Sequence, residues 1–168
     1  MSQQSYSPFQ ILVQKFASTR PGAWFFARTA HHLDKLFLRL SGGRTTLVQI
    51  VSGLPALMIT TTGAKSGSPR TVPLVYIRDV ENTGQFAIIA SNLGQHQLPA
   101  WYYNLKAHPR ATGIIDRQVE TYITHEANDE EYARFWQVAT EIYPGYQLYQ
   151  KRVGKRRIPI MVLTVEET

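Results

Sequence analysis

The sequence predicts a mainly β domain with helices, of the α+β class, whose six to seven short antiparallel strands form a barrel or a sandwich. Short apolar, β-branched segments follow one another from Thr45 onward, and glycine and proline separate them. Helical crossovers between these segments are nearly absent, which indicates antiparallel pairing. A barrel is favoured over a sandwich because closure removes exposed strand edges.

The N-terminal segment, residues 1–44, is predicted to be helical and to pack on the barrel. Pro21 suits the first turn of a helix, and Gly42 and Gly43 suit its end. Between them an apolar stripe recurs at steps of four and three residues, through Phe26, Ala30, Leu33, Phe37 and Leu40. The other face is basic and carries Arg28, His31, His32, Lys35 and Arg39. That face is either solvated or close to anionic lipid, with the apolar stripe in the membrane surface.

Residues 45–168 complete a single domain, because 168 residues are short of the usual size for two domains. Seven segments are predicted as strands: 45–51, 56–62, 71–78, 85–91, 111–115, 119–125 and 158–165. Hairpin turns are expected at 81–84 and 116–118. A short helix is expected within 99–108. A longer helix begins near Asn128, which has capping-box spacing to Glu131, and ends at Pro144.

The charge balance indicates a negatively charged partner. Lysine and arginine number 18 against 12 aspartate and glutamate residues, so the formal net charge is +6. Nucleic acid, an anionic membrane face, and a cofactor with phosphate and carboxylate groups all match this charge. Nucleic acid is disfavoured, because aromatic and basic residues do not interleave on a strand platform. The absence of cysteine and of a signal-peptide pattern predicts a cytoplasmic protein.

A glycine-containing turn, "TGAKSGSPR", separates two of the predicted strands. Gly63 and Gly67 permit backbone angles that other residues avoid, and Lys65 and Arg70 bracket the turn. The turn is either an ordinary solvated turn or an anion-binding loop. A P-loop is excluded, because there Gly-Lys-Ser/Thr opens a helix, whereas here Lys65 and Ser66 precede Gly67 and a strand follows.

Three tyrosines recur at steps of three in "YPGYQLY": Tyr143, Tyr146 and Tyr149. On a helix they lie on one side, where they either pack in the core or form a pocket wall for a planar substrate. The next segment, "KRVGKRR" at 151–157, is either a solvated surface or a site for a polyanion. The histidines lack metal-ligand spacing and no Gly-x-Ser-x-Gly motif occurs, so neither a metal site nor a serine hydrolase is expected.

Four motifs occur in a specific order: "PALMITTTGAKSGSPRTVPLVYI", "ASNLG", "PAWYYNLKAHPR" and "YPGYQLYQ". Through them the chain from about residue 50 to its C-terminus resembles the deazaflavin-dependent nitroreductase family of the flavin and deazaflavin split-barrel superfamily. The N-terminal part resembles the membrane-associated, quinone-reducing branch of that family. The resemblance implies an FMN-binding-like split β-barrel that binds coenzyme F-420, an 8-hydroxy-5-deazaflavin whose tail carries a phosphodiester and a chain of glutamates.

The resemblance also implies which residues bind this cofactor. The phosphate and acidic tail are assigned to Ala64, Lys65, Ser66 and Arg70, and the next strand runs along the cofactor with Thr71, Val72, Pro73, Leu74 and Val75. The ring is flanked by Ile89, Ala90, Ser91 and Asn92 and by Ala100, Trp101, Tyr102, Tyr103 and Asn104, with Trp101 as its aromatic contact. Ala64 stands where the family usually has arginine, which removes one charged donor. Asn92 stands where some relatives have lysine.

By the same resemblance, the chain transfers hydride from the reduced cofactor to a quinone or a nitroaromatic compound. Tyr146, which also contacts the cofactor, orients the acceptor with the help of Ser91, and Tyr143 and Tyr149 shape the pocket. Two alternatives stay open: an FMN-binding split-barrel protein, and a non-catalytic protein that carries a cofactor or docks on a membrane. An anionic membrane surface on the inner face of the cell membrane is a further expected partner of the N-terminal helix. The chain is expected to be a monomer or a homodimer.

Overall fold

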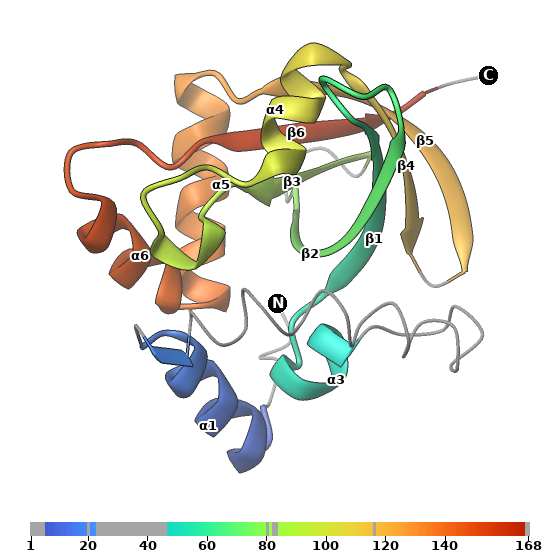
Figure 1. Cartoon of the computed structure of the whole chain (residues 1–168). Coiled ribbons are helices and arrows are strands. Elements are labelled where there is room, and N and C mark those ends of the chain that lie inside the picture. Colours follow the sequence, from blue (N-terminus) through green and yellow to red (C-terminus); the bar gives the residue numbers. More distant parts are fainter. Residues whose placement is uncertain are drawn as a thin grey trace.

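The computed structural model describes residues 6–19, 21–22, 47–79, 81, 84–115 and 117–166. Six antiparallel strands form a closed barrel in the order β1-β2-β3-β6-β5-β4 (Figure 1). They are β1 (Ala56–Thr62), β2 (Pro69–Arg78), β3 (Gln85–Ile89), β4 (Arg110–Ile115), β5 (Gln118–Glu126) and β6 (Ile160–Val165). The predicted fold class is confirmed. The predicted apolar stripe and basic face of the N-terminal segment lie outside the described residues.

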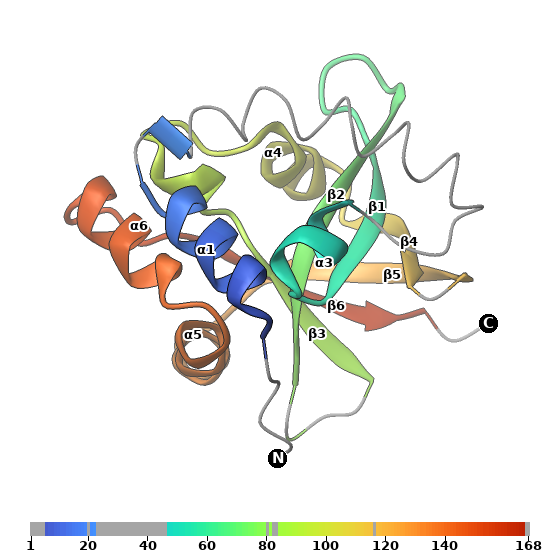
Figure 2. The same cartoon turned by 90° about the horizontal axis from the view of Figure 1, so that it is seen from below.

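Helices surround the barrel on several sides (Figures 1 and 2). They are α1 (Pro8–Ala17), α3 (Leu47–Ser52), the 3-10 helix η1 (Asn92–Gly94), α4 (Ala100–Ala107), α5 (Asp129–Ile142) and α6 (Gly145–Val153). Seen from below, α1 lies between α3 and α6, and it contacts both (Figure 2). The expected helices within 99–108 and after Asn128 are both present. No helix in the described ranges is long and apolar enough to cross a bilayer.

The strand predicted at 45–51 is wrong, because this segment contributes to helix α3 instead. Both edges of β1 are occupied, by β2 and by β4, so the segment could not have paired with β1. Gly53 follows the helix with a φ of 71°, a left-handed angle that commonly ends helices. The Gln14 side chain of α1 also donates to the Ser52 carbonyl at 2.6 Å. Tertiary contacts thus outweigh the β-branched composition of the segment.

Strand β2 changes partners along its length. Its first part, Pro69–Val75, pairs with β1, whereas Tyr76–Arg78 pair with β3. The Tyr76 N–H donates to the Pro55 carbonyl, and ladder bonds alternate along a strand, so the N–H groups of Thr71 and Val75 point away from β1. The side of Val75 that faces away from β1 lies opposite Ile89 of β3, and no strand in the described part of the chain pairs with that side of 69–74. We call this stretch the open edge of β2.

Two clusters of buried apolar side chains form the core. All six strands contribute to the first cluster, which therefore fills the barrel interior, and α4 covers it with Trp101 and Leu105. The second cluster lies on the outer face of β2, β3 and β6, where α5 and α6 pack. Along β6 the side chains alternate between the two, because Met161 belongs to the first cluster and Val162 to the second.

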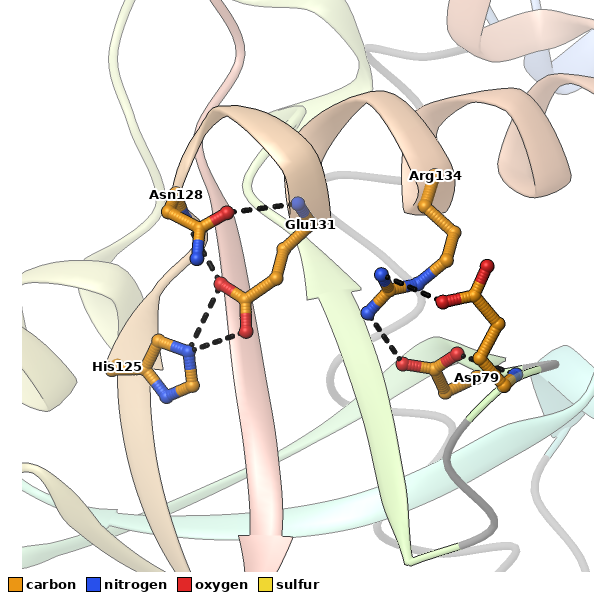
Figure 3. A network of polar contacts seen from close by, with 6 residues as sticks. Asp79, His125, Asn128, Glu131 and Arg134 are labelled. Carbon is orange, nitrogen blue, oxygen red and sulfur yellow. Dashed lines mark hydrogen bonds and ion pairs between the residues drawn. The ribbon is translucent and has the colours of Figure 1, made fainter.

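Polar contacts fix α5 to the barrel near its N-terminal end (Figure 3). The Glu131 N–H donates to the Asn128 side chain and the Asn128 N–H donates to the Glu131 carboxylate, so the predicted capping box is confirmed. His125 on β5 contacts the same carboxylate at 2.9 Å. Further along the helix, Arg134 lies 2.9 Å from Asp79 and 3.1 Å from Glu81. The Asp79 carboxylate is fully buried.

Replacing Arg134 by leucine is expected to lower the free energy of unfolding by about 3 kcal/mol, because it removes a charged partner from a buried carboxylate. Arg110→Leu is the matched control, because its ion pair with Glu166 is largely exposed. Its loss is expected to stay below about 1 kcal/mol. Chemical denaturation measures both variants, and equal losses would contradict a structural role for the Arg134–Asp79 pair.

Candidate functional site

The loop between β1 and β2 contains the residues predicted to bind an anionic tail. It lies at one end of the barrel beside α4 (Figure 1). The Gly67 N–H donates to the Gly63 carbonyl at 2.8 Å, and the Gly63 N–H donates to the Ser68 carbonyl at 2.9 Å. Of the two glycines, Gly67 has a left-handed φ of 66°. Gly63 is needed for space instead, because a Cβ there would lie 2.7 Å from the Ser66 hydroxyl.

Asn104 on α4 fixes the loop in place. Its Oδ1 accepts a hydrogen bond from the Ala64 N–H at 3.0 Å, and its Nδ2 donates to the Thr61 hydroxyl at 3.0 Å. The side chain is buried, so both ends of the amide are used inside the protein. Asn104, predicted to flank the cofactor ring, instead supports the loop between β1 and β2 in this structure.

Two cations and two amide groups of the loop remain for an anion. The N–H groups of Lys65 and Ser66 have no partner among the described residues, whereas those of Ala64 and Gly67 are bonded inside the protein. Neither Lys65 nor Arg70 forms an ion pair within the same part of the chain. Lys65, Ser66 and Arg70 are exposed. This donor set matches a phosphate or a carboxylate.

The open edge of β2 continues from this loop. Thr71 to Val75 are half-buried, and their side chains alternate between the two clusters. Val72 and Leu74 pack on the barrel interior, whereas Val75 packs on the cluster beneath α6. Pro73 has no N–H, so the edge presents the N–H group of Thr71 together with the carbonyl groups on the same side. Such an edge suits an extended ligand that accepts hydrogen bonds from backbone.

The segment after β3 turns in a strained conformation. Asn92, Leu93 and Gly94 have φ values of 44°, 55° and 77°, which places three consecutive residues in the left-handed region. For a residue with a side chain this region costs about 1–2 kcal/mol, so surrounding contacts must hold the turn. The Asn92 side chain donates to the Gln97 carbonyl at 2.8 Å, and the preceding Ser91 is buried. Strain of this kind is frequent at functional sites.

The three predicted tyrosines form one buried aromatic cluster, although they come from two helices and not one. Tyr143 follows the last residue of α5, and Tyr146 and Tyr149 lie on α6. The hydroxyls of Tyr143 and Tyr149 lie 3.0 Å apart. Tyr143 also contacts the Gln14 carbonyl at 3.3 Å, and Tyr149 contacts the Ala17 carbonyl at 3.2 Å. Each phenol has one proton. Tyr143 donates its proton to the Gln14 carbonyl and Tyr149 donates its proton to the Ala17 carbonyl, so neither proton is left for a ligand while α1 is docked.

The hydroxyl of Tyr146 differs from the other two, because it has no hydrogen-bond partner among the described residues. Its ring packs against Tyr143, Tyr149 and Trp136, at centroid distances of 5.4, 6.1 and 6.3 Å. Burial, and to a smaller extent Tyr143, raises the pKa of Tyr146 far above its ordinary value. The phenol therefore stays protonated at neutral pH. Tyr146 keeps 6% of its surface exposed, so a hydroxyl without a protein partner can bond to the polar atom of a ligand.

The aromatic residues of α4 point in different directions. The Trp101 ring is buried in the barrel interior, the Tyr102 hydroxyl donates to Glu126 on β5 at 3.1 Å, and Tyr103 is 53% exposed. Ala100 is exposed at the start of the helix. The predicted contacts of the cofactor ring thus do not converge into one cluster.

The predicted site residues fall into two groups. Val72, Leu74, Ala90, Trp101 and Tyr102 share the cluster of the barrel interior. Val75, Ile89 and the three tyrosines share the cluster beneath α5 and α6. Strand β2 contributes to both groups and connects them to the loop with Lys65. Among the described residues, no group of three or more His, Cys, Asp or Glu side chains could hold a metal ion.

The docking of α1 on the tyrosines is a feature that the sequence analysis missed. A signal was present, because Ser7 and Gln10 form a capping box with Pro8 at the first helical position. The contacts between α1 and the tyrosines join residues far apart in sequence, and no local pattern indicates them.

Replacing Asn104 by leucine is expected to lower the free energy of unfolding by about 2 kcal/mol, because two buried polar partners lose their hydrogen bonds. Amide exchange at Ala64 should rise at the same time. Asn104→Asp is the matched control, because it keeps the acceptor for the Ala64 N–H and loses only the donor to Thr61. Unchanged amide exchange at Ala64 in the leucine variant would contradict the role of Asn104 in holding the loop.

Comparison with known proteins identifies relatives of this chain. The family model described as F420H(2)-dependent quinone reductase matches residues 32–165. An F420H(2)-dependent quinone reductase of Mycobacterium tuberculosis is 38% identical over 119 residues, which are 66% of this chain and 73% of that protein. A second, putative F420H(2)-dependent quinone reductase of the same species is 32% identical over 113 residues, 66% of this chain and 89% of that protein.

Two solved structures also resemble this chain. One is described as an F420-H2 dependent reductase; it is 39% identical, with a TM-score of 0.57, and the match covers 67% of this chain and 94% of that one. The other is described as a domain-swapped dimer; it is 36% identical, with a TM-score of 0.59, and the match covers 79% and 95%. From the family match and these identities, the chain belongs to the F420H(2)-dependent quinone reductase family.

Proposed function

We propose that this chain is an oxidoreductase that binds reduced coenzyme F-420 along the open edge of β2 and reduces a quinone held at Tyr146. Family membership supports the cofactor and the reaction class. The observation that carries the site assignment is the Tyr146 hydroxyl, which has no hydrogen-bond partner in the described part of the chain, while the hydroxyls of its two tyrosine neighbours are hydrogen-bonded.

The loop and the open edge have donors that match the cofactor. Lys65, Arg70 and the N–H groups of Lys65 and Ser66 would hold the phosphate and the acidic tail, which carry several negative charges. The open edge of β2 would offer the N–H group of Thr71 to the part of the cofactor that follows. Ala64 adds no charge to this set, so Lys65 and Arg70 provide most of the electrostatic attraction.

When bound, reduced coenzyme F-420 supplies a hydride. Negative charge then develops on the quinone oxygen, and the Tyr146 hydroxyl would donate a hydrogen bond to that oxygen. Because burial raises the pKa of Tyr146, this phenol serves as a hydrogen-bond donor and not as the source of the proton that completes the hydroquinone. The proton would come from solvent. The rings of Tyr143 and Tyr149 would shape the aromatic wall.

Two finer expectations extend this proposal. A nitroaromatic compound is also planar and has oxygen atoms at its edge, so it could replace the quinone as hydride acceptor, with Tyr146 donating a hydrogen bond to a nitro oxygen. Contact with an anionic membrane surface is supported by the apolar residues Phe9, Leu12 and Phe16, which are exposed at helical spacing on α1.

Replacing Tyr146 by phenylalanine is expected to lower kcat for menadione reduction by about tenfold to a hundredfold, because it removes a donor to the developing oxyanion. The Kd of reduced coenzyme F-420 should change little. Tyr143→Phe is the matched comparison, because its hydroxyl is bonded to Tyr149 and α1, and its kcat should fall less. Steady-state kinetics at saturating cofactor measure both, and an unchanged kcat in the Tyr146 variant would exclude this role.

Reversing the charge of Lys65 or Arg70 is expected to weaken binding of coenzyme F-420 at least tenfold at low salt, and less at high salt, where screening is stronger. Titration followed by absorbance measures the affinity. Lys155→Glu is the control with the same charge change at an exposed position outside the loop. A parallel titration with FMN tests the alternative cofactor, and tighter binding of FMN would overturn the assignment.

A further inference from the structure

The basic segment 151–157 was interpreted from the sequence as a solvated surface or a polyanion site. In the structure, its arginines instead bond to other parts of the protein. Arg152, Arg156 and Arg157 all contact protein atoms, whereas Lys151 and Lys155 are exposed. Two of these arginines donate to backbone carbonyls of one segment: Arg152 to Leu93 at 3.4 Å and Arg156 to Gln95 at 3.1 Å. The basic segment is therefore directed at the strained turn after β3.

Arg152 also joins this turn to the N-terminal helix. Its second guanidinium nitrogen donates to the Ser18 carbonyl, at the C-terminal end of α1. Its guanidinium carbon lies 5.5 Å from the centroid of the Tyr149 ring. A planar fork with fixed donors suits this geometry, because one side chain bonds two carbonyls from segments far apart in sequence. One residue thus contacts the turn, α1 and the tyrosine cluster.

The turn requires such support from outside. Leu93 has a left-handed φ of 55°, which a residue with a side chain avoids unless its surroundings hold it. Gly94 packs closely on α6, because a Cβ there would lie 3.1 Å from the Tyr149 backbone and from the Arg152 side chain. Within the turn, the Gly94 N–H donates to the Ser91 carbonyl, the Gln95 N–H donates to the Asn92 carbonyl, and the Asn92 side chain donates to the Gln97 carbonyl.

We infer that Arg152 is a positioning residue: it holds the left-handed turn 92–94 in the form that the cofactor requires and ties the docking of α1 to that form. The inference rests on the proposed function, in which Ser91 and Asn92 flank the ring. Arg156 supports the same turn at Gln95 and makes no contact with α1 among the described residues. Loss of Arg152 should therefore affect two segments, and loss of Arg156 one.

Amide hydrogen exchange of the full chain tests this coupling without any ligand. In Arg152→Gln we expect exchange to rise about tenfold or more at Gly94 and Gln95 and, in parallel, at Ser18 and Thr19 near the end of α1. Arg156→Gln should raise exchange only in the turn. Lys151→Gln is the matched control on the same helix and should change neither segment. Unchanged exchange in the turn of Arg152→Gln, or an equal rise at barrel amides such as Ala87, would overturn the inference.

A second measurement separates positioning from simple stability. Arg152→Gln is expected to weaken binding of reduced coenzyme F-420 about tenfold with little change in Tm, and Arg152→Lys, which retains one donor, should recover part of that affinity. Unchanged affinity in a variant whose turn exchanges faster would overturn the positioning role. If the unmodified chain did not bind the cofactor, the proposed function would fail, whereas the exchange results would still decide the coupling between the turn and α1.

Discussion

The change of partner along β2 is the constraint on which the rest of the structure depends. Because β2 leaves β1 for β3 at Tyr76, the barrel closes and still has a stretch of backbone that no described strand pairs on one side. Pro69 begins that stretch beside the basic loop, and Leu74 ends it, one residue before Val75 in the cluster with Tyr146. At about 3.3 Å per residue, these five steps span roughly 17 Å. One strand therefore connects a site for negative charge to an aromatic site.

Much of this architecture could be predicted from the sequence, because its determinants are local. Glycine, proline and β-branched residues mark six of the strands, and Asn128 with Glu131 marks the start of α5. The strand predicted at 45–51 was wrong for a tertiary reason, since β4 and β2 occupy both edges of β1. Local pattern carries no information on such competition for an edge.

The candidate site was predictable only as a set of segments. The sequence and its family resemblance indicated the loop, the strand after it and the three tyrosines. They did not indicate that Asn104 supports the loop, that α1 takes the hydroxyls of Tyr143 and Tyr149, or that Arg152 contacts two distant carbonyls. These roles depend on pairs of residues far apart in the chain. In each case a polar side chain bonds to backbone groups of a segment far away in the sequence.

The most direct measurement of the proposed cofactor site is an amide chemical-shift titration of the full chain with coenzyme F-420. Binding along the open edge of β2 predicts the largest shifts at Lys65, Ser66 and Thr71, whose N–H groups face away from β1 or have no partner among the described residues. The hairpin of β4 and β5 should shift little. Saturable shifts confined to that hairpin, with the β2 amides unchanged, would contradict the proposed site.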